Sequence, residues 1–104
     1  MSSEQWKWIP GYLGLYKVST FGRVASFKTH RPKLLKLHPH VGTGHLKVTI
    51  VGHRGELQSY YVSRLVLASF VSTPQEGDRV EHLDGDIENN RLENLKWASK
   101  KSDD

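Results

Sequence analysis

The sequence lacks cysteine altogether, which excludes disulfide bonds, thiolate zinc sites and a cysteine nucleophile. It also lacks any apolar run near the roughly 18 residues that a membrane span needs. The first residues show no basic leader followed by an apolar stretch. We therefore expect a soluble, unprocessed protein that has no membrane partner and works in a reducing compartment.

Large apolar residues are well represented. Hydrophobic residues make up 37% of the 104 positions and include 3 Trp, 4 Tyr and 3 Phe. Such a chain can bury a core, so wholesale disorder is excluded. The length suits one compact domain and is too short for two independent cores. We predict a single domain over residues 1–104.

Positive charge is in excess and unevenly placed. The formal net charge is +4, and basic residues dominate between positions 23 and 64, whereas most acids follow position 76. A basic excess favours polyanions, nucleic acid first among them, although many basic domains bind neither nucleic acid nor membranes. The pattern suggests a DNA-gripping surface beside an acidic, metal-binding part.

Two hairpins are predicted in the first 62 residues. Residues 16–19 and 23–27 alternate around a turn in which Gly22 supplies unusual backbone angles. Residues 46–51 and 57–62 flank a second turn that contains two glycines. The basic segment 29–39 holds two prolines, so we expect an irregular or edge segment there.

A short helix is predicted at residues 63–70, where apolar residues recur at helical spacing and Ser63 can cap the first turn. Residues 79–83 indicate a short strand, and residues 84–86 a turn that Asp84 serves. The expected fold is α+β: a small antiparallel sheet with a short helix, followed by a second, smaller unit.

The C-terminal third predicts a second helix. Asn90 and Glu93 have the spacing of a capping box, so this helix should begin at Asn90 and run to about residue 101. Asn89 and Asn90 are then caps rather than ligands. The buried stripe of this helix would be formed by Leu92, Leu95 and Trp97.

Three stretches carry a family resemblance. Residues 80–97 read VEHLDGDIENNRLENLKW and resemble the HNH motif of phage and intron-encoded endonucleases. Residues 6–24 fit the pattern W-x-x-I-x-G-Y-x-G-x-Y-x-V-S-x-x-G-x-V, a module that commonly precedes those nucleases. The helix at residues 63–70 resembles the one that lies between the two. The pieces occur in the family's order and cover most of the chain.

The resemblance implies a ββα-metal fold, in which two short strands and a helix surround one divalent ion. Residues 1–62 would form the DNA-contacting β-hairpin part, 63–78 the helix and loop, and 79–104 the catalytic motif. A histidine would take a proton from the attacking water, and the ion would bind the scissile phosphate. The products would carry 5′-phosphate and 3′-hydroxyl ends.

The resemblance also assigns the site residues. His82 matches the general base, whose imidazole has a reference pKa near ~6.5. Asn94 matches the asparagine that braces the loop and orients the base. Glu81 and Asp103 match the ligands of one Mg²⁺ or Mn²⁺, an ion that prefers oxygen donors. Since adjacent strand residues face opposite sides, Glu81 and His82 require a local distortion, which the turn at Asp84 would provide.

The sequence departs from the family at three positions. Glu81 is one methylene longer than the usual ligand, Asp103 lies beside the C-terminal residue, and Ser63 replaces a common histidine. The other five histidines (His30, His38, His40, His45 and His53) are interpreted as loop or strand-surface residues.

Basic residues around the motif are predicted to contact DNA phosphates, although each of them also fits a merely solvated position. Arg91, in the first turn of the expected motif helix, is the candidate for the phosphate near the metal. The full set is Arg23, Lys28, Arg31, Lys33, Lys36, Lys47, Arg54, Arg64 and Arg91.

The predicted function is therefore metal-dependent hydrolysis of double-stranded DNA by an endonuclease of homing or nicking type. We expect a monomer or weak dimer in the cytoplasm of a bacterial or phage-infected cell. Because few residues follow the motif, sequence specificity should be modest. One alternative is a catalytically weak or inactive DNA-binding module. Another is a protein-interaction domain, which would show no salt-dependent DNA affinity.

Overall fold

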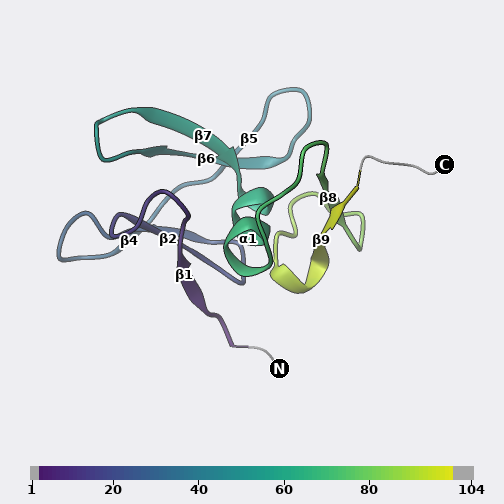
Figure 1. The fold of residues 1–104 in the computed structure, drawn as a ribbon, viewed down its shortest axis with the longest axis horizontal. Helices are drawn as coiled ribbons and strands as arrows, with labels where there is room; N and C mark the ends of the chain where they lie inside the picture. Colours follow the sequence, from purple (N-terminus) through teal and green to yellow (C-terminus); the bar gives the residue numbers. More distant parts are fainter. Residues whose placement is uncertain (1–2, 100–104) are drawn as a thin grey trace.

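In the computed structural model, which describes residues 3–99, three small antiparallel sheets surround one α-helix. The first sheet has the order β1-β2-β3-β4 and contains the predicted N-terminal hairpin (Figure 1). Its turn includes Gly22, whose φ of 86° is reached at low cost by glycine. The strands are β1 (Trp6–Trp8), β2 (Tyr16–Ser19), β3 (Val24–Ser26) and β4 (Lys33–Leu34).

The second sheet contains the other predicted hairpin. Strands β6 (Leu46–Val51) and β7 (Leu57–Tyr61) pair antiparallel, with β5 (His38–Pro39) at the edge beside β6. The short strands β4 and β5 lie at sheet edges, as the prolines predicted. Residue 62, which we had assigned to the second hairpin, instead begins the helix.

Helix α1 (Val62–Phe70) confirms the predicted helix and lies at the centre of the molecule. The expected cap is wrong, because Tyr61 occupies the N-cap position without a side-chain cap bond. Ser63 lies one position into the helix and is 4% exposed. Its side chain is therefore buried in the first turn instead of closing it.

The predicted C-terminal helix is absent from the described part of residues 90–101. The chain forms β8 (Arg79–His82), a 3₁₀ turn η1 (Leu92–Asn94) and β9 (Leu95–Ala98), and β8 and β9 pair antiparallel. Asn90 therefore caps no α-helix, and η1 begins after Arg91 without a side-chain cap bond. An apolar residue at every second or third position fits a strand as well as a helix over so short a stretch, and pairing with β8 decided the outcome.

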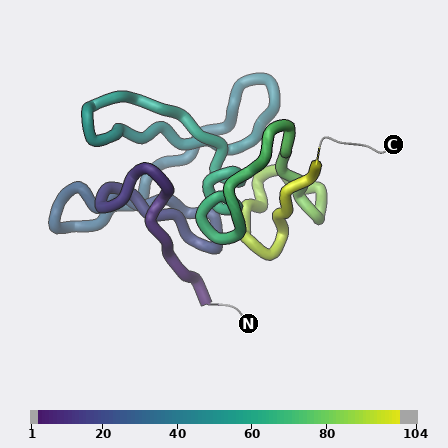
Figure 2. The backbone as a smooth tube through the Cα atoms, viewed as in Figure 1, coloured from purple at the N-terminus to yellow at the C-terminus, as the bar shows by residue number. Residues whose placement is uncertain are grey.

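One hydrophobic cluster joins the parts of the chain. It contains Ile9 and Val18 from the N-terminal part, Ile50 from β6, Leu67 from α1 and Leu95 from β9. The tube in Figure 2 shows the turn between β2 and β3 beside the C-terminal part of the chain, next to the helix. The α+β class is confirmed, and no helix within residues 3–99 is long and apolar enough to cross a membrane.

Candidate active site

The β8–β9 hairpin places Glu81 and His82 on opposite faces. Glu81 pairs in register with Lys96, and its Oε1 lies 3.8 Å from the lysine Nζ, with both side chains more than half exposed. His82 pairs with Leu95 and is half-buried on the other face. The pairing is regular up to His82, so the local distortion expected between base and ligand is not present.

The ring of His82 is held from one side by an asparagine. Its Nε2 lies 2.8 Å from Oδ1 of Asn90, which is 5% exposed. An amide oxygen only accepts hydrogen bonds, so Nε2 carries the proton of the neutral ring. Nδ1 then holds the lone pair that is able to take a proton from water.

The loop between β8 and η1 is braced by Asn94, which is 8% exposed. Its Oδ1 accepts the N–H of Asp84 at 3.0 Å, and its Nδ2 donates to Asp84 Oδ1 and to the Asn89 carbonyl, both at 2.9 Å. The backbone N–H of Leu83 donates to the Asn94 carbonyl at 2.8 Å. These bonds close the loop directly after His82, in keeping with the bracing role expected of Asn94.

Asp84 is an acceptor within this loop. Hydrogen bonds from Asn89, from the N–H of Asp86 and from Asn94 hold the pKa of the Asp84 carboxyl below its usual value. Both carboxylate oxygens are thus engaged in the loop, so Asp84 serves the turn, as expected.

A hollow beside His82 is rich in donors. The His45 ring lies 5.5 Å from the His82 ring and lines a pocket together with Arg64 and Arg79. The rest of the lining is Tyr61, Ser63 and Val80. Burial lowers the pKa of His45, and the nearby His82 and His40 rings lower it further. The hollow therefore combines two guanidinium groups with a neutral imidazole, a donor set suited to a phosphate.

The described residues supply one of the two predicted metal ligands. Glu81 presents an exposed carboxylate, whereas Asp103 lies outside the described residues. Within residues 3–99 no three His, Cys, Asp or Glu side chains gather into a ligand cluster. A hard divalent ion takes few protein carboxylates, so the donor chemistry of Glu81 suits such an ion. In this hairpin, however, Glu81 lies on the face opposite to His82.

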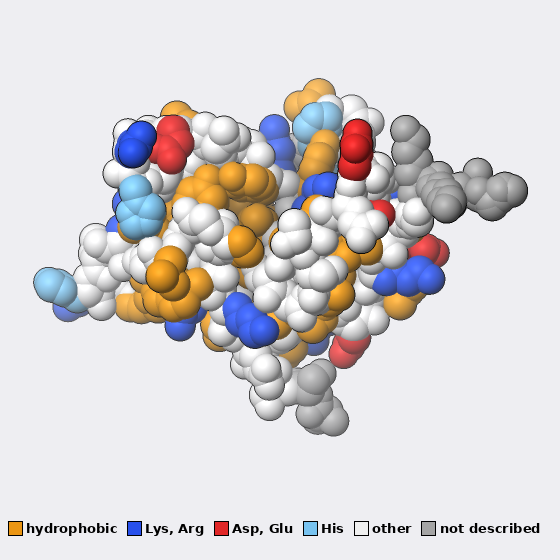
Figure 3. Space-filling view, in the orientation of Figure 1, with side chains coloured by type: hydrophobic (Ala, Val, Ile, Leu, Met, Phe, Trp, Pro, Cys, Tyr) orange, Lys and Arg blue, Asp and Glu red, His pale blue; other side chains and the backbone are white. Residues whose placement is uncertain are grey.

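The predicted DNA-contacting residues come from several elements of the fold. Arg64 lies at the hollow beside His82, whereas Lys33 is on β4 and Lys47 on β6. Lys and Arg side chains are spread over several elements on the face shown in Figure 3. The remaining members lie around the N-terminal hairpin and in loops, namely Arg23, Lys28, Arg31, Lys36, Arg54 and Arg91.

Several of these cations have protein partners, since Arg64 lies 5.1 Å from the centre of the Trp97 ring and Lys28 lies 5.9 Å from that of Tyr16. Arg23 forms an ion pair with Glu4, which raises the pKa of the guanidinium and lowers the pKa of the carboxyl. The guanidinium of Arg91 lies 4.0 Å from the centre of the Phe21 ring, a cation–π contact. The expected phosphate contact of Arg91 therefore competes with packing against the N-terminal hairpin.

Sequence reasoning missed three residues of this region. Asn90 was interpreted as a helix cap and His45 as a surface residue, yet both lie against His82. Arg79 was assigned only to a strand, although it lines the hollow. Charge at a strand end was a signal for Arg79, whereas no local pattern indicates a contact over the 37 positions that separate His45 from His82.

Two family models match the chain. The NUMOD4 motif matches residues 4–51, and the HNH endonuclease family matches residues 60–104. The boundary between them falls within the β6–β7 hairpin, just before α1.

Two relatives are similar to this protein over nearly the whole chain. DNA endonuclease I-HmuI of Bacillus phage SP01 is 37% identical over 97 residues, which cover 93% of this chain and 53% of that protein. The uncharacterized HNH endonuclease L247 of Acanthamoeba polyphaga mimivirus is 35% identical over 101 residues, 93% of this chain and 24% of that protein. The chain thus spans about half or less of the length of these relatives.

A solved structure has the same fold. The structure described as DNA binding and cleavage by the HNH homing endonuclease I-HmuI superposes with a TM-score of 0.80 and 34% identity. The match covers 92% of this chain and 53% of the other. Since the matched segments occur in the same order as the two family models, the chain belongs to the HNH endonuclease family and carries a NUMOD4 motif in its N-terminal half.

Proposed function

We propose that this chain is the cleaving part of a metal-dependent DNA endonuclease, of homing or nicking type, with His82 as general base. The observation that carries the proposal is the bond from His82 Nε2 to Asn90 Oδ1, which leaves Nδ1 free to accept a proton. Half-burial of the ring keeps it reachable by water while its orientation is held.

In the proposed reaction, Nδ1 of His82 takes a proton from a water that attacks the scissile phosphorus. The water oxygen bonds to phosphorus as the phosphorus–3′-oxygen bond breaks, which leaves a 5′-phosphate. The leaving 3′ oxygen takes a proton from solvent water and becomes a hydroxyl. Arg64, Arg79 and His45 bind the phosphate from the hollow. Asn94 holds the loop that follows His82 and acts on the base through it.

Glu81 and Asp103 are the proposed ligands of one Mg²⁺ or Mn²⁺. Such an ion, when bound, supplies positive charge to the phosphate and to the leaving oxygen. The Glu81–Lys96 pair is exposed and worth roughly 0–1 kcal/mol, so it opposes ion binding only weakly.

The substrate is proposed to be double-stranded DNA, because the solved relative is described as binding and cleaving DNA. We place the protein in the cytoplasm of a bacterial or phage-infected cell, as a monomer or weak dimer, in keeping with the phage relative. A second candidate is a DNA-binding module of the same fold with weak or no cleavage, because Glu81 is one methylene longer than the usual ligand and lies on the face opposite to His82.

Relaxation of supercoiled plasmid in a Mg²⁺ and Mn²⁺ series tests the proposal. Cleavage should stop in EDTA and in His82→Ala, while DNA binding by fluorescence anisotropy persists. The matched control is His53→Ala, since His53 is exposed in the β6–β7 turn. Equal cleavage by His82→Ala and the wild type would refute the general base. Binding without cleavage in every metal would establish the second candidate.

The variant Glu81→Gln tests metal binding separately from the role of His82 as general base. It should raise the Mg²⁺ concentration needed for half-maximal cleavage by roughly 10-fold to 100-fold, as loss of groups that support a metal does. Lys96→Gln removes the partner of Glu81 and should not raise that concentration. Identical metal dependence in both variants and the wild type would remove Glu81 from the ligand set.

A further inference from the structure

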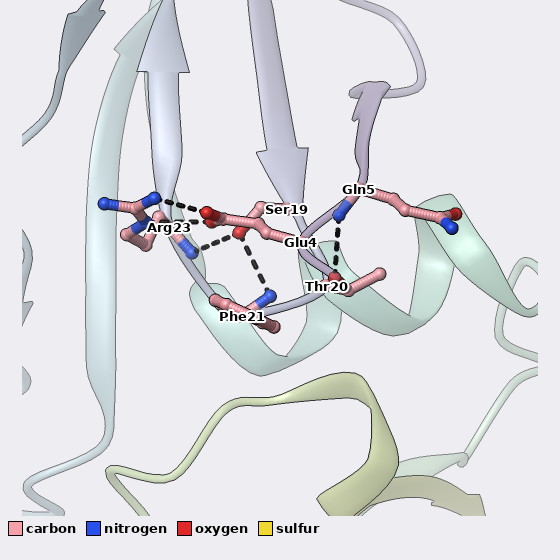
Figure 4. A network of polar contacts seen from close by, with 6 residues as sticks. All are labelled: Glu4, Gln5, Ser19, Thr20, Phe21 and Arg23. Carbon is pink, nitrogen blue, oxygen red and sulfur yellow. Dashed lines mark hydrogen bonds and ion pairs between the residues drawn. The ribbon is translucent and has the colours of Figure 1, made fainter. Parts of the chain in front are cut away.

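Hydrogen bonds from its own side chains hold the turn of the N-terminal hairpin. The Ser19 Oγ accepts the N–H groups of Phe21 at 3.0 Å and Arg23 at 3.2 Å. The Thr20 Oγ1 accepts the N–H of Gln5 at 3.0 Å, which ties the turn to the strand beside it (Figure 4). The two Ser19 bonds are local and hold the turn itself, whereas the Thr20 bond joins the turn to Gln5.

This turn lies directly against residues 90–92, at the end of the loop that joins β8 to η1. The N–H of Leu92 donates to the Thr20 carbonyl at 2.8 Å, and the Phe21 ring packs under the Arg91 guanidinium. Gly22 also lies close to this segment, because a Cβ there would be 2.9 Å from the Asn90 carbonyl oxygen and 3.0 Å from the Asn90 Cβ. Only a residue without a side chain permits this approach.

Asn90 connects that contact to the base. Its backbone and Cβ lie against Gly22, and its Oδ1 lies 2.8 Å from His82 Nε2. One residue thus separates the turn of the N-terminal part from the imidazole. Asn94 holds the chain just before Asn90 through the Asn89 carbonyl, and Gly22 is the neighbour that lies against the Asn90 backbone and Cβ.

We propose that the turn at residues 20–22 is a positioning element for His82, acting through Asn90. The inference deepens the proposed function, since it concerns the orientation of the same base. Gly22 allows the close approach, and Asn90 keeps the proton on Nε2 so that Nδ1 faces the attacking water. Neither residue touches the reacting atoms. The N-terminal part therefore contributes to the chemical step as well as to the DNA-contacting surface.

Gly22→Ala tests the contact, and Gly14→Ala is its matched control. Both glycines have a φ of 86°, so both variants carry the same backbone strain, but a Cβ at Gly14 meets nothing within 4 Å. The readouts are the protonated ring nitrogen of His82, from ¹⁵N NMR at about pH 8 where a free imidazole is neutral, the single-turnover cleavage rate, and the Kd for DNA.

In Gly22→Ala we expect a mixed tautomer at His82 and a cleavage rate lowered roughly 10-fold to 100-fold, the usual cost of a displaced reacting group, with an unchanged Kd. Gly14→Ala should keep the wild-type tautomer and rate. Asn90→Ala should match Gly22→Ala, and Asn90→Asp, which keeps an acceptor oxygen, should retain the proton on Nε2.

Equal effects in the two glycine variants, or a wild-type tautomer in a folded Gly22→Ala protein, would overturn the proposal. If Gly22→Ala does not fold, Phe21→Ala decides, because it removes the packing on Arg91 and leaves the turn backbone intact. An unchanged tautomer in Phe21→Ala would then overturn it. The NMR readout needs no activity, so a chain that fails to cleave DNA still tests the positioning.

Discussion

Asn94 holds Asp84 through both ends of its side-chain amide. Its Oδ1 accepts the Asp84 N–H at 3.0 Å while its Nδ2 donates to Asp84 Oδ1 at 2.9 Å. The same Nδ2 also donates to the Asn89 carbonyl at 2.9 Å. With 8% of Asn94 exposed, solvent has little access to replace these bonds, so the loop after His82 depends on this one residue.

Asn94→Ala should therefore destabilise the protein. Leaving buried groups without partners costs about 1–3 kcal/mol, and the loss should appear as a lower midpoint in urea unfolding. Glu88→Ala, an exposed position in the same loop, is the control and should leave the midpoint unchanged. Equal midpoints for the two variants would show that the bonds of Asn94 do not stabilise the fold.

We expect the contribution of Asp84 to the free energy of unfolding to be lost in acid. Hydrogen bonds from Asn89, Asp86 and Asn94 lower the pKa of the Asp84 carboxyl below 3.8 in the folded state. The ionised form is thus favoured by folding, and its contribution is complete above the unfolded pKa and lost as pH falls through the folded pKa. The gap in unfolding free energy between wild type and Asp84→Asn should narrow below about pH 4. A pH-independent gap would contradict this assignment.

We expect the contribution of Tyr12 to the free energy of unfolding to be lost in alkali. Burial, together with the hydrogen bond to the Tyr60 hydroxyl at 2.9 Å, raises the pKa of Tyr12 to about 12. The neutral phenol is favoured by folding, so its contribution is complete below the unfolded pKa of about 10 and is lost as pH rises toward the folded value. Titration of absorbance at the phenolate band should show a step near pH 12 that Tyr12→Phe removes and Tyr61→Phe retains.

The hollow beside His82 predicts phosphate contacts by Arg64 and Arg79. Replacing either with Gln should weaken DNA binding and reduce the slope of log K against log salt by about 1, the value for one lost phosphate contact. Lys7→Gln is the control, because Lys7 is exposed on β1 and belongs to no predicted contact set. A slope equal to that of the wild type would exclude the substituted arginine from the DNA interface.

The local elements were predictable where one pattern allowed one structure. The alternation before and after Gly22 permits a hairpin and little else, and the proline-rich basic segment could only occupy sheet edges. The segment from Asn90 to Trp97 was ambiguous, because its apolar spacing fits both a helix and a strand. Pairing with β8 at four positions made residues 95–98 a strand, and this pairing joins segments that are not adjacent in the chain.

The sequence alone determined the order of the motifs, the two hairpins and α1. It also determined the choice of His82 as the candidate base, since each of these rests on residues close together in the chain. Tertiary structure decided the rest. It turned Glu81 away from His82, brought His45 and Asn90 to the imidazole, and placed Gly22 against Asn90. Ring orientation and close backbone approach depend on packing between segments that are distant in the chain, and no local pattern encodes them.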